Sequence, residues 1–125
     1  MIIHNGDDWA KRFEEICEQW TKVNHHLAGI SCSFDDWEHV DIIFEKLEAT
    51  AFFVYIYNCV IEDQEAFAGK ETTTLKAWGY CQIYLNDFIA YCEKLQFQDK
   101  ICQQFQLQLL EYLHALRDFF SGIFQ

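Results

Sequence analysis

The sequence predicts an all-α protein, a single-domain four-helix bundle over residues 1–125. Three observations favour this fold class. Apolar residues recur at spacings of three and four in four segments, which is the period of an amphipathic helix. The chain has no proline and five glycines, so it contains few of the residues that interrupt helices or bound strands. Its residues are 51% hydrophobic, and a chain of this length can bury one core.

The first predicted helix runs from Asp7 to Leu27. Asn5 or Asp7 is expected to cap its start. The apolar positions form one helical face: Trp9, Phe13, Ile16, Cys17, Trp20, Val23 and Leu27.

The second predicted helix occupies the stretch from Ser33 to Ala66. Ser33 and Asp36 have the spacing of a capping box, and Asp35 and Asp36 place negative charge in the first turn, where the helix dipole stabilises it. Its expected core stripe is Trp37, Val40, Phe44, Leu47, Ala51, Val54 and Ile61. The stretch contains no glycine or proline, which favours one long helix over a strand. We expect this helix to be the central one.

The third predicted helix is capped by one of Thr72, Thr73 or Thr74. Its stripe is Leu75, Trp78, Cys81 or Gln82, Leu85, Phe88, Ile89, Cys92 and Leu95. Gly79 lies inside it at a cost of roughly 1 kcal/mol relative to Ala, which we interpret as room for close packing against a bulky side chain.

The fourth predicted helix follows Asp99 as its cap, with the stripe Cys102, Phe105, Leu109, Tyr112, Leu113, Leu116 and Phe120. Short joints predict antiparallel neighbours and an up-down-up-down order. The segment from Phe119 to Gln125 is unusually apolar for a terminus. It is expected either to dock back on the bundle or to form a homodimer through Phe119, Ile123 and Phe124.

Several classes of protein are disfavoured. The chain starts without the pattern of a secretion signal, and its longest nearly unbroken apolar run, from Ala49 to Ile61, is too short to span a membrane. We therefore expect a cytoplasmic protein with no membrane partner. Six cysteines without a Cys-x-x-Cys pair are expected to be reduced core thiols. Nine basic residues against twenty acidic ones argue against direct nucleic-acid binding.

No catalytic motif and no cofactor motif occurs, so we expect no enzyme activity and no cofactor. The sequence contains two acid-x-x-His pairs with the spacing that di-iron bundles use. They are Glu111 with His114 and Asp36 with His39. The two pairs fall at different heights of the predicted bundle, so both are interpreted as solvent-side contacts within a helix. We therefore assign no metal, and a metal-binding bundle remains an alternative.

The acidity of the chain is concentrated in the second predicted helix. Residues 33–66 contain nine acidic residues and one basic residue, Lys46, which gives −8 of the net −11. Within this stretch one angular band, opposite the core stripe, is predicted to bind a partner. Its members are Glu38, Asp41, Glu45, Glu48, Phe52, Tyr55, Glu62 and Asp63.

These features favour a small acidic protein that binds and neutralises a basic partner such as a nuclease toxin, as an immunity protein or antitoxin does. The alternatives are a phage-type inhibitor of a nucleic-acid-handling enzyme, a structural helical protein that self-associates, and the metal-binding bundle.

Overall fold

The structure is a computed structural model that describes residues 7–50, 53, 56 and 71–123. These residues form four helices, α1 (Asp7–Ala28), α2 (Phe34–Ala49), α5 (Glu71–Lys94) and α6 (Lys100–Ile123). No strand occurs in the described ranges, so the predicted all-α class is confirmed. Helix α5 begins before the three threonines that were predicted to cap it.

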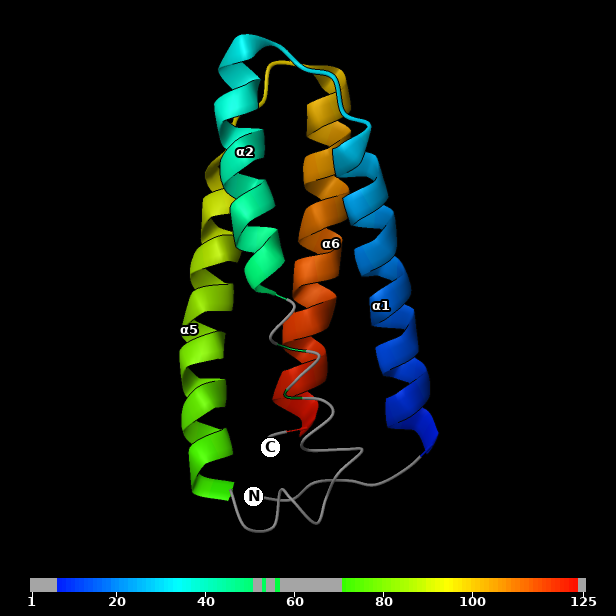
Figure 1. Cartoon of the computed structure of the whole chain (residues 1–125), viewed down its shortest axis with the longest axis vertical. Coiled ribbons are helices and arrows are strands. Elements are labelled where there is room, and N and C mark those ends of the chain that lie inside the picture. Colours follow the sequence, from blue (N-terminus) through cyan, green and yellow to red (C-terminus); the bar gives the residue numbers. More distant parts are fainter. Residues whose placement is uncertain (1–6, 51–52, 54–55, 57–70, 124–125) are drawn as a thin grey trace.

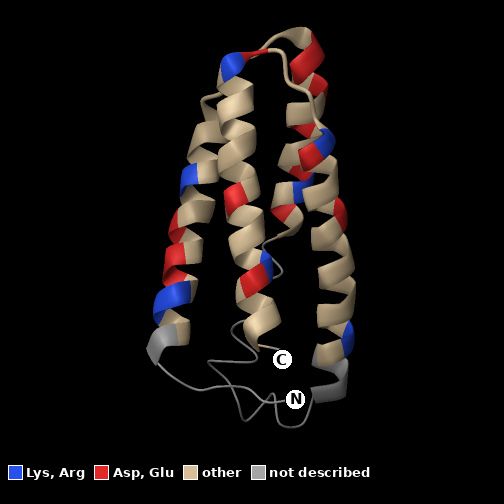
Figure 2. Cartoon of the chain, turned by 180° about the vertical axis from the view of Figure 1, so that it is seen from behind, with Lys and Arg blue, Asp and Glu red and all other residues tan. Residues whose placement is uncertain are grey.

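Helix α6 is the central helix of the described structure. It packs along both α1 and α5, and the joints before α2 and before α6 lie at the same end of the molecule (Figure 1). Figure 2 shows that α6 carries few charged residues over most of its length. Its buried side chains are Cys102, Phe105, Leu109, Tyr112, Leu113, Leu116, Phe119, Phe120 and Ile123, which include all seven residues of the predicted stripe. The prediction that the second helix is central is not supported for its described part, α2, and apart from Phe53 and Ile56 the remainder of the predicted helix lies outside the described residues.

Aromatic rings gather around Phe120 near the end of α6. Its ring centroid lies 5.1 Å from that of Phe119, 5.2 Å from Phe53 and 5.7 Å from Trp78. Tilted and edge-to-face pairs of this kind each contribute about 0.5–1.5 kcal/mol beyond the area they bury. Phe119 and Ile123 are buried, so the apolar C-terminal segment docks back on its own chain as far as it is described. Phe124, the third residue of the predicted homodimer contact, lies outside the described residues.

Helix α2 ends earlier than predicted. The backbone N–H and the hydroxyl of Thr50 both donate to the carbonyl of Leu47, at 3.1 and 2.6 Å, and Thr50 caps the helix after Ala49. The predicted uninterrupted helix is therefore wrong at Thr50. Beyond this point Phe53 and Ile56 are described, and both are helical and buried.

The buried face of α2 also differs from the predicted one. It consists of Asp36, Val40, Ile43 and Leu47. Trp37 and Phe44, predicted to be core residues, are 51% and 46% exposed. Each follows a buried residue in the sequence, so each lies about 100° around the helix from the core face.

The described cysteines, Cys17, Cys32, Cys81, Cys92 and Cys102, are all free. Cys92 and Cys102 are buried, and burial raises the pKa of the Cys92 thiol to about 12. These two residues therefore behave as apolar core side chains. None of the helices in the described ranges is both long and apolar enough to cross a membrane.

Gly79 does not support the predicted close packing, because a Cβ atom built there has no neighbour within 4 Å. Gly122 is different, since an added Cβ would lie 3.1 Å from Cη2 of Trp9.

Replacement of Gly79 by alanine is expected to raise the free energy of unfolding by about 0.5–1 kcal/mol, because alanine loses less backbone entropy in a helix and meets open space here. Gly122→Ala is the matched control and is expected to gain less, because it crowds the Trp9 ring. Urea denaturation of both variants measures the difference. A Gly79→Ala variant less stable than the parent would contradict the packing described around this residue.

Candidate functional site

Four carboxylates, Glu38, Asp41, Glu45 and Glu48, lie on the outer face of α2, and all four are exposed. They lie on the side of α2 away from its buried residues, Asp36, Val40, Ile43 and Leu47. No ion pair joins any of them to another described residue. The row is therefore a negative surface without a neutralising side chain in the described part of the chain.

Lys46 explains why this charge stays unbalanced. Its ammonium nitrogen lies 5.7 Å from the ring centroid of Tyr84 and 5.7 Å from that of Tyr91, both on α5. A cation over aromatic faces is stabilised by the ring quadrupoles. The Tyr84 hydroxyl also donates to the backbone carbonyl of Lys46, at 3.0 Å. The single base of residues 33–66 thus faces α5 and is directed away from the carboxylate row.

The predicted continuation of the band, Phe52, Tyr55, Glu62 and Asp63, lies outside the described residues. Two half-exposed aromatic side chains, Trp37 and Phe44, lie beside the row on the described part of α2. Sequence periodicity assigned both to the core, so it missed them as surface residues.

A groove separates α1 from α2 beside these two aromatic side chains. It has a volume of about 310 Å³. Its lining residues come from both helices: Asn24, Leu27 and Ala28 of α1, and Trp37, Val40, Asp41 and Phe44 of α2. The groove is mostly apolar, and Asp41 brings the carboxylate row to its edge. We call it the α1–α2 groove.

The rotation of α2 is fixed by Asp36, which is only 2% exposed. Its carboxylate accepts the backbone N–H of Gln98 at 3.0 Å and that of Asp99 at 2.8 Å, at the start of α6. In return, the Asp99 carboxylate accepts the backbone N–H of Ser33, at 2.5 Å. The two acids therefore cap each other's helices, and we call this arrangement the Asp36–Asp99 cap.

The predicted capping box is half right. The Ser33 hydroxyl accepts the N–H of Asp36, at 3.4 Å, as a cap should. The N–H of Ser33 donates to Asp99, the residue just before α6, and not to Asp36. Burial alone would raise the pKa of the Asp36 carboxyl. The backbone N–H groups of Asp99 and Gln98, His39 and the Asp99 side chain together outweigh burial, so this pKa is lowered.

The same place offers the one candidate metal-ligand set found among the described residues. One ligand atom each of Asp36, Asp99 and Cys102 lie within 4.8 Å of one another. Both Asp36 oxygens and one Asp99 oxygen already accept backbone N–H groups. Burial and the neighbouring Cys32, Asp36 and Asp99 raise the pKa of the Cys102 thiol to about 12, which opposes metal binding by its thiolate. Helix capping therefore accounts for this cluster without a metal.

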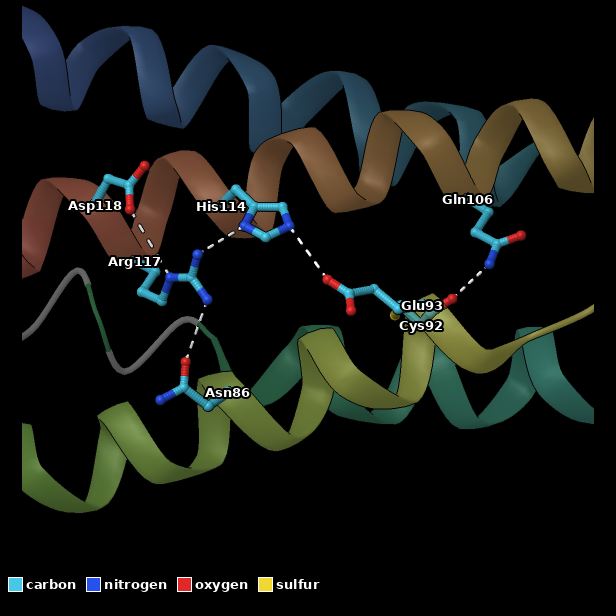
Figure 3. A network of polar contacts seen from close by, with 7 residues as sticks. All are labelled: Asn86, Cys92, Glu93, Gln106, His114, Arg117 and Asp118. Carbon is cyan, nitrogen blue, oxygen red and sulfur yellow. Dashed lines mark hydrogen bonds and ion pairs between the residues drawn. The ribbon is translucent and has the colours of Figure 1, made fainter.

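The two predicted acid-x-x-His pairs do not come together. His39 contacts the Tyr91 hydroxyl at 3.2 Å, and the buried Asp36 corrects the interpretation of that pair as solvent-side. His114 lies 3.5 Å from Glu93 of α5 and 2.9 Å from Arg117, and Arg117 reaches Asn86 (Figure 3). This network links α5 to α6 and does not include Glu111. It therefore does not bring together the carboxylates and histidines that a dimetal centre needs.

A second hollow, of about 240 Å³, lies between α1 and α6. Its lining is almost entirely apolar, with Cys17, Thr21, Thr50 and Tyr112 as the polar groups. Its titratable groups are Cys17 and Tyr112, and burial raises the pKa of both.

Comparison with protein-family models, curated proteins and solved structures finds no match. The geometry of α2 and its groove is therefore the basis for a functional proposal.

Substitution of Asp36 by asparagine tests the cap. At pH 7 it is expected to lower the free energy of unfolding by about 1.5–3 kcal/mol, because buried hydrogen bonds to a charged group are weakened. A lowered folded-state pKa means that Asp36 stabilises the protein above its unfolded pKa, near 4, and that this contribution is lost as pH falls through the folded value. The variant should therefore lose less stability than the parent on acidification below about pH 4.

Asp35→Asn is the matched control, because Asp35 is exposed in the same first turn. It is expected to change the free energy of unfolding by no more than about 0.5 kcal/mol. Equal effects of the two substitutions in urea denaturation between pH 3 and 7 would exclude the cap as a source of stability.

Proposed function

We propose that this chain is a small acidic protein that binds and neutralises a basic protein partner, with a nuclease toxin as the leading candidate and an immunity protein or antitoxin as the functional type. The observation that carries the proposal is the unpaired carboxylate row of α2 next to two half-exposed aromatic side chains. A phage-type inhibitor of a nucleic-acid-handling enzyme would use the same surface. We place this activity in the cytoplasm.

The spacing of the row suits a basic surface that binds nucleic acid. From Glu38 to Glu48 the helix rises about 15 Å, so its four carboxylates are spaced at about one per 5 Å, roughly two-thirds of the density of phosphates along one DNA strand, about one per 3.4 Å. An acidic helix of this kind can occupy a groove built for a phosphate backbone. Such a match also steers a cationic partner and makes its association rate depend on salt.

A face that served only solubility would not need this arrangement. Asp41, Glu45 and Glu48 follow one another at spacings of four and three residues, and like charges at these spacings each destabilise a helix by a few tenths of a kcal/mol. An interspersed lysine would remove that cost, yet Lys46 is held against the rings of α5. The cost is understandable if a cationic partner offsets it.

We also propose that the four helices form one up-down-up-down bundle with α2 on its surface. Packing of α6 against α1 and α5 and the two short joints at one end support this arrangement. Burial of Phe119 and Ile123 gives no support to self-association through the C-terminal tail.

Simultaneous reversal of Glu45 and Glu48 to lysine is expected to weaken binding of the basic partner by about two orders of magnitude or more, because attraction becomes repulsion at the centre of the row. The full chain, used as bait in an extract of its native host, supplies the partner. Titration calorimetry at low and high salt then gives the dissociation constants of parent and variant.

The matched control reverses Asp87 of α5 and Glu111 of α6, which are both exposed. Each double variant changes the net charge from −11 to −7, since each reversal adds two charges. If both double variants weaken binding equally, the overall charge of the protein and not this face of α2 attracts the partner. If the Glu45→Lys, Glu48→Lys variant binds with unchanged affinity, the proposed site is refuted.

A further inference from the structure

Two of the exposed aromatic side chains of α2 are spaced as an anchor pair. Trp37 and Phe44 are seven residues apart, which is two helical turns or about 10.5 Å along the axis. Both line the α1–α2 groove, whose floor contains the buried Leu27 and Val40. Large aromatic side chains at the edge of an apolar groove are typical of surfaces that bind a partner.

The charge around this groove is one-sided. Asp41 lies between the two aromatic residues in the sequence and lines the groove itself. Glu48 follows Phe44 by one turn on the same side of α2, and Glu45 lies farther around the helix. The only residues of α1 that line the groove are Asn24, Leu27 and Ala28, which carry no charge. A segment seated in the groove therefore meets apolar surface on one side and carboxylates along the α2 edge.

We propose that the α1–α2 groove binds an amphipathic basic helix of the partner protein. This inference rests on the proposed function and specifies the part of the partner that is recognised. Apolar side chains of the partner helix, at positions i, i+3 or i+4 and i+7, enter the groove between α1 and the Trp37–Phe44 pair. Its lysine or arginine residues lie along the α2 edge and pair with Asp41, Glu45 and Glu48.

A helix fits this surface better than an extended strand does. The described structure is helical and offers no sheet edge to which a strand could add its backbone hydrogen bonds. A helix satisfies its own backbone, so it needs only side-chain contacts of the kind that the groove provides. The two-turn spacing of Trp37 and Phe44 also matches the repeat of anchors along one helical face.

The test uses two fluorescent peptides of leucine and lysine, each about 18 residues or five turns long. One places its leucines on a single helical face, and the other has the same composition in a shuffled order without an apolar face. Fluorescence anisotropy measures their affinity for the full chain and its variants. We expect the amphipathic peptide to bind about tenfold or more tightly than the shuffled one.

Trp37→Ala and Phe44→Ala are each expected to remove most of that difference, because they delete the anchors. Tyr80→Ala on α5 is the control, since Tyr80 is 77% exposed and lies away from the groove. Circular dichroism shows whether each variant keeps its helix content. If Phe44→Ala has less helix than the parent protein, the milder Phe44→Leu and Asp41→Asn variants replace it. The affinities of the two peptides are then compared for these variants.

The outcomes separate this inference from the proposed function. Equal binding of the two peptides, or no effect of Trp37→Ala and Phe44→Ala, overturns the helix-binding groove while leaving the acidic row intact as a site. A third peptide has glutamine in place of each lysine of the amphipathic peptide. If it binds as tightly as the lysine peptide, the proposed charge pairing is overturned. The proposed function itself would be overturned by a different result, namely that the Glu45→Lys, Glu48→Lys variant binds the basic partner as tightly as the parent protein does.

Discussion

Reciprocal capping between Asp36 and Asp99 is the constraint on which the exposed surface of α2 depends. A buried carboxylate is strongly unfavourable unless hydrogen bonds compensate it, and Asp36 has that compensation only while the N–H groups of Gln98 and Asp99 face it. This requirement fixes α2 in one rotation about its axis. Val40, Ile43 and Leu47 then point inward, whereas Trp37, Phe44 and the carboxylate row remain outside.

The remainder of the described structure divides into a strongly packed part and a more lightly held helix. Helix α6 packs on α1 and α5 along its length, and the rings around Phe120 close the end opposite the cap. Helix α2 is held by the cap, by its three apolar residues and by Lys46 over the rings of α5. The groove beside α1 is the consequence of this partial packing. Helix α2, the shortest of the four described helices, is thus also the one whose charge and aromatic surface we propose to bind a partner.

Periodicity predicted the stripe of α6 and most of the stripes of α1 and α5, because a buried helical face with few polar interruptions leaves a direct trace in the sequence. Trp20 and Leu75, which it assigned to the core, are 38% and 40% exposed. It also placed the four acids correctly relative to one another, since that relation depends only on helix geometry. It failed for the core face of α2, where hydrophobicity favours Trp37 and Phe44 over an aspartate. The partners of Asp36 lie more than sixty residues away in the sequence, so no local pattern reveals that it is buried.

Amide hydrogen exchange measured by NMR tests the central role of the cap most directly. The N–H groups of Ser33, Gln98 and Asp99 lie in or beside joints, where amides ordinarily exchange quickly. The cap predicts that all three are protected in the parent protein and lose protection together in Asp36→Asn, while amides in the middle of α6 keep theirs. Rapid exchange of Gln98 and Asp99 in the parent protein would contradict the cap and, with it, the orientation of the proposed binding surface.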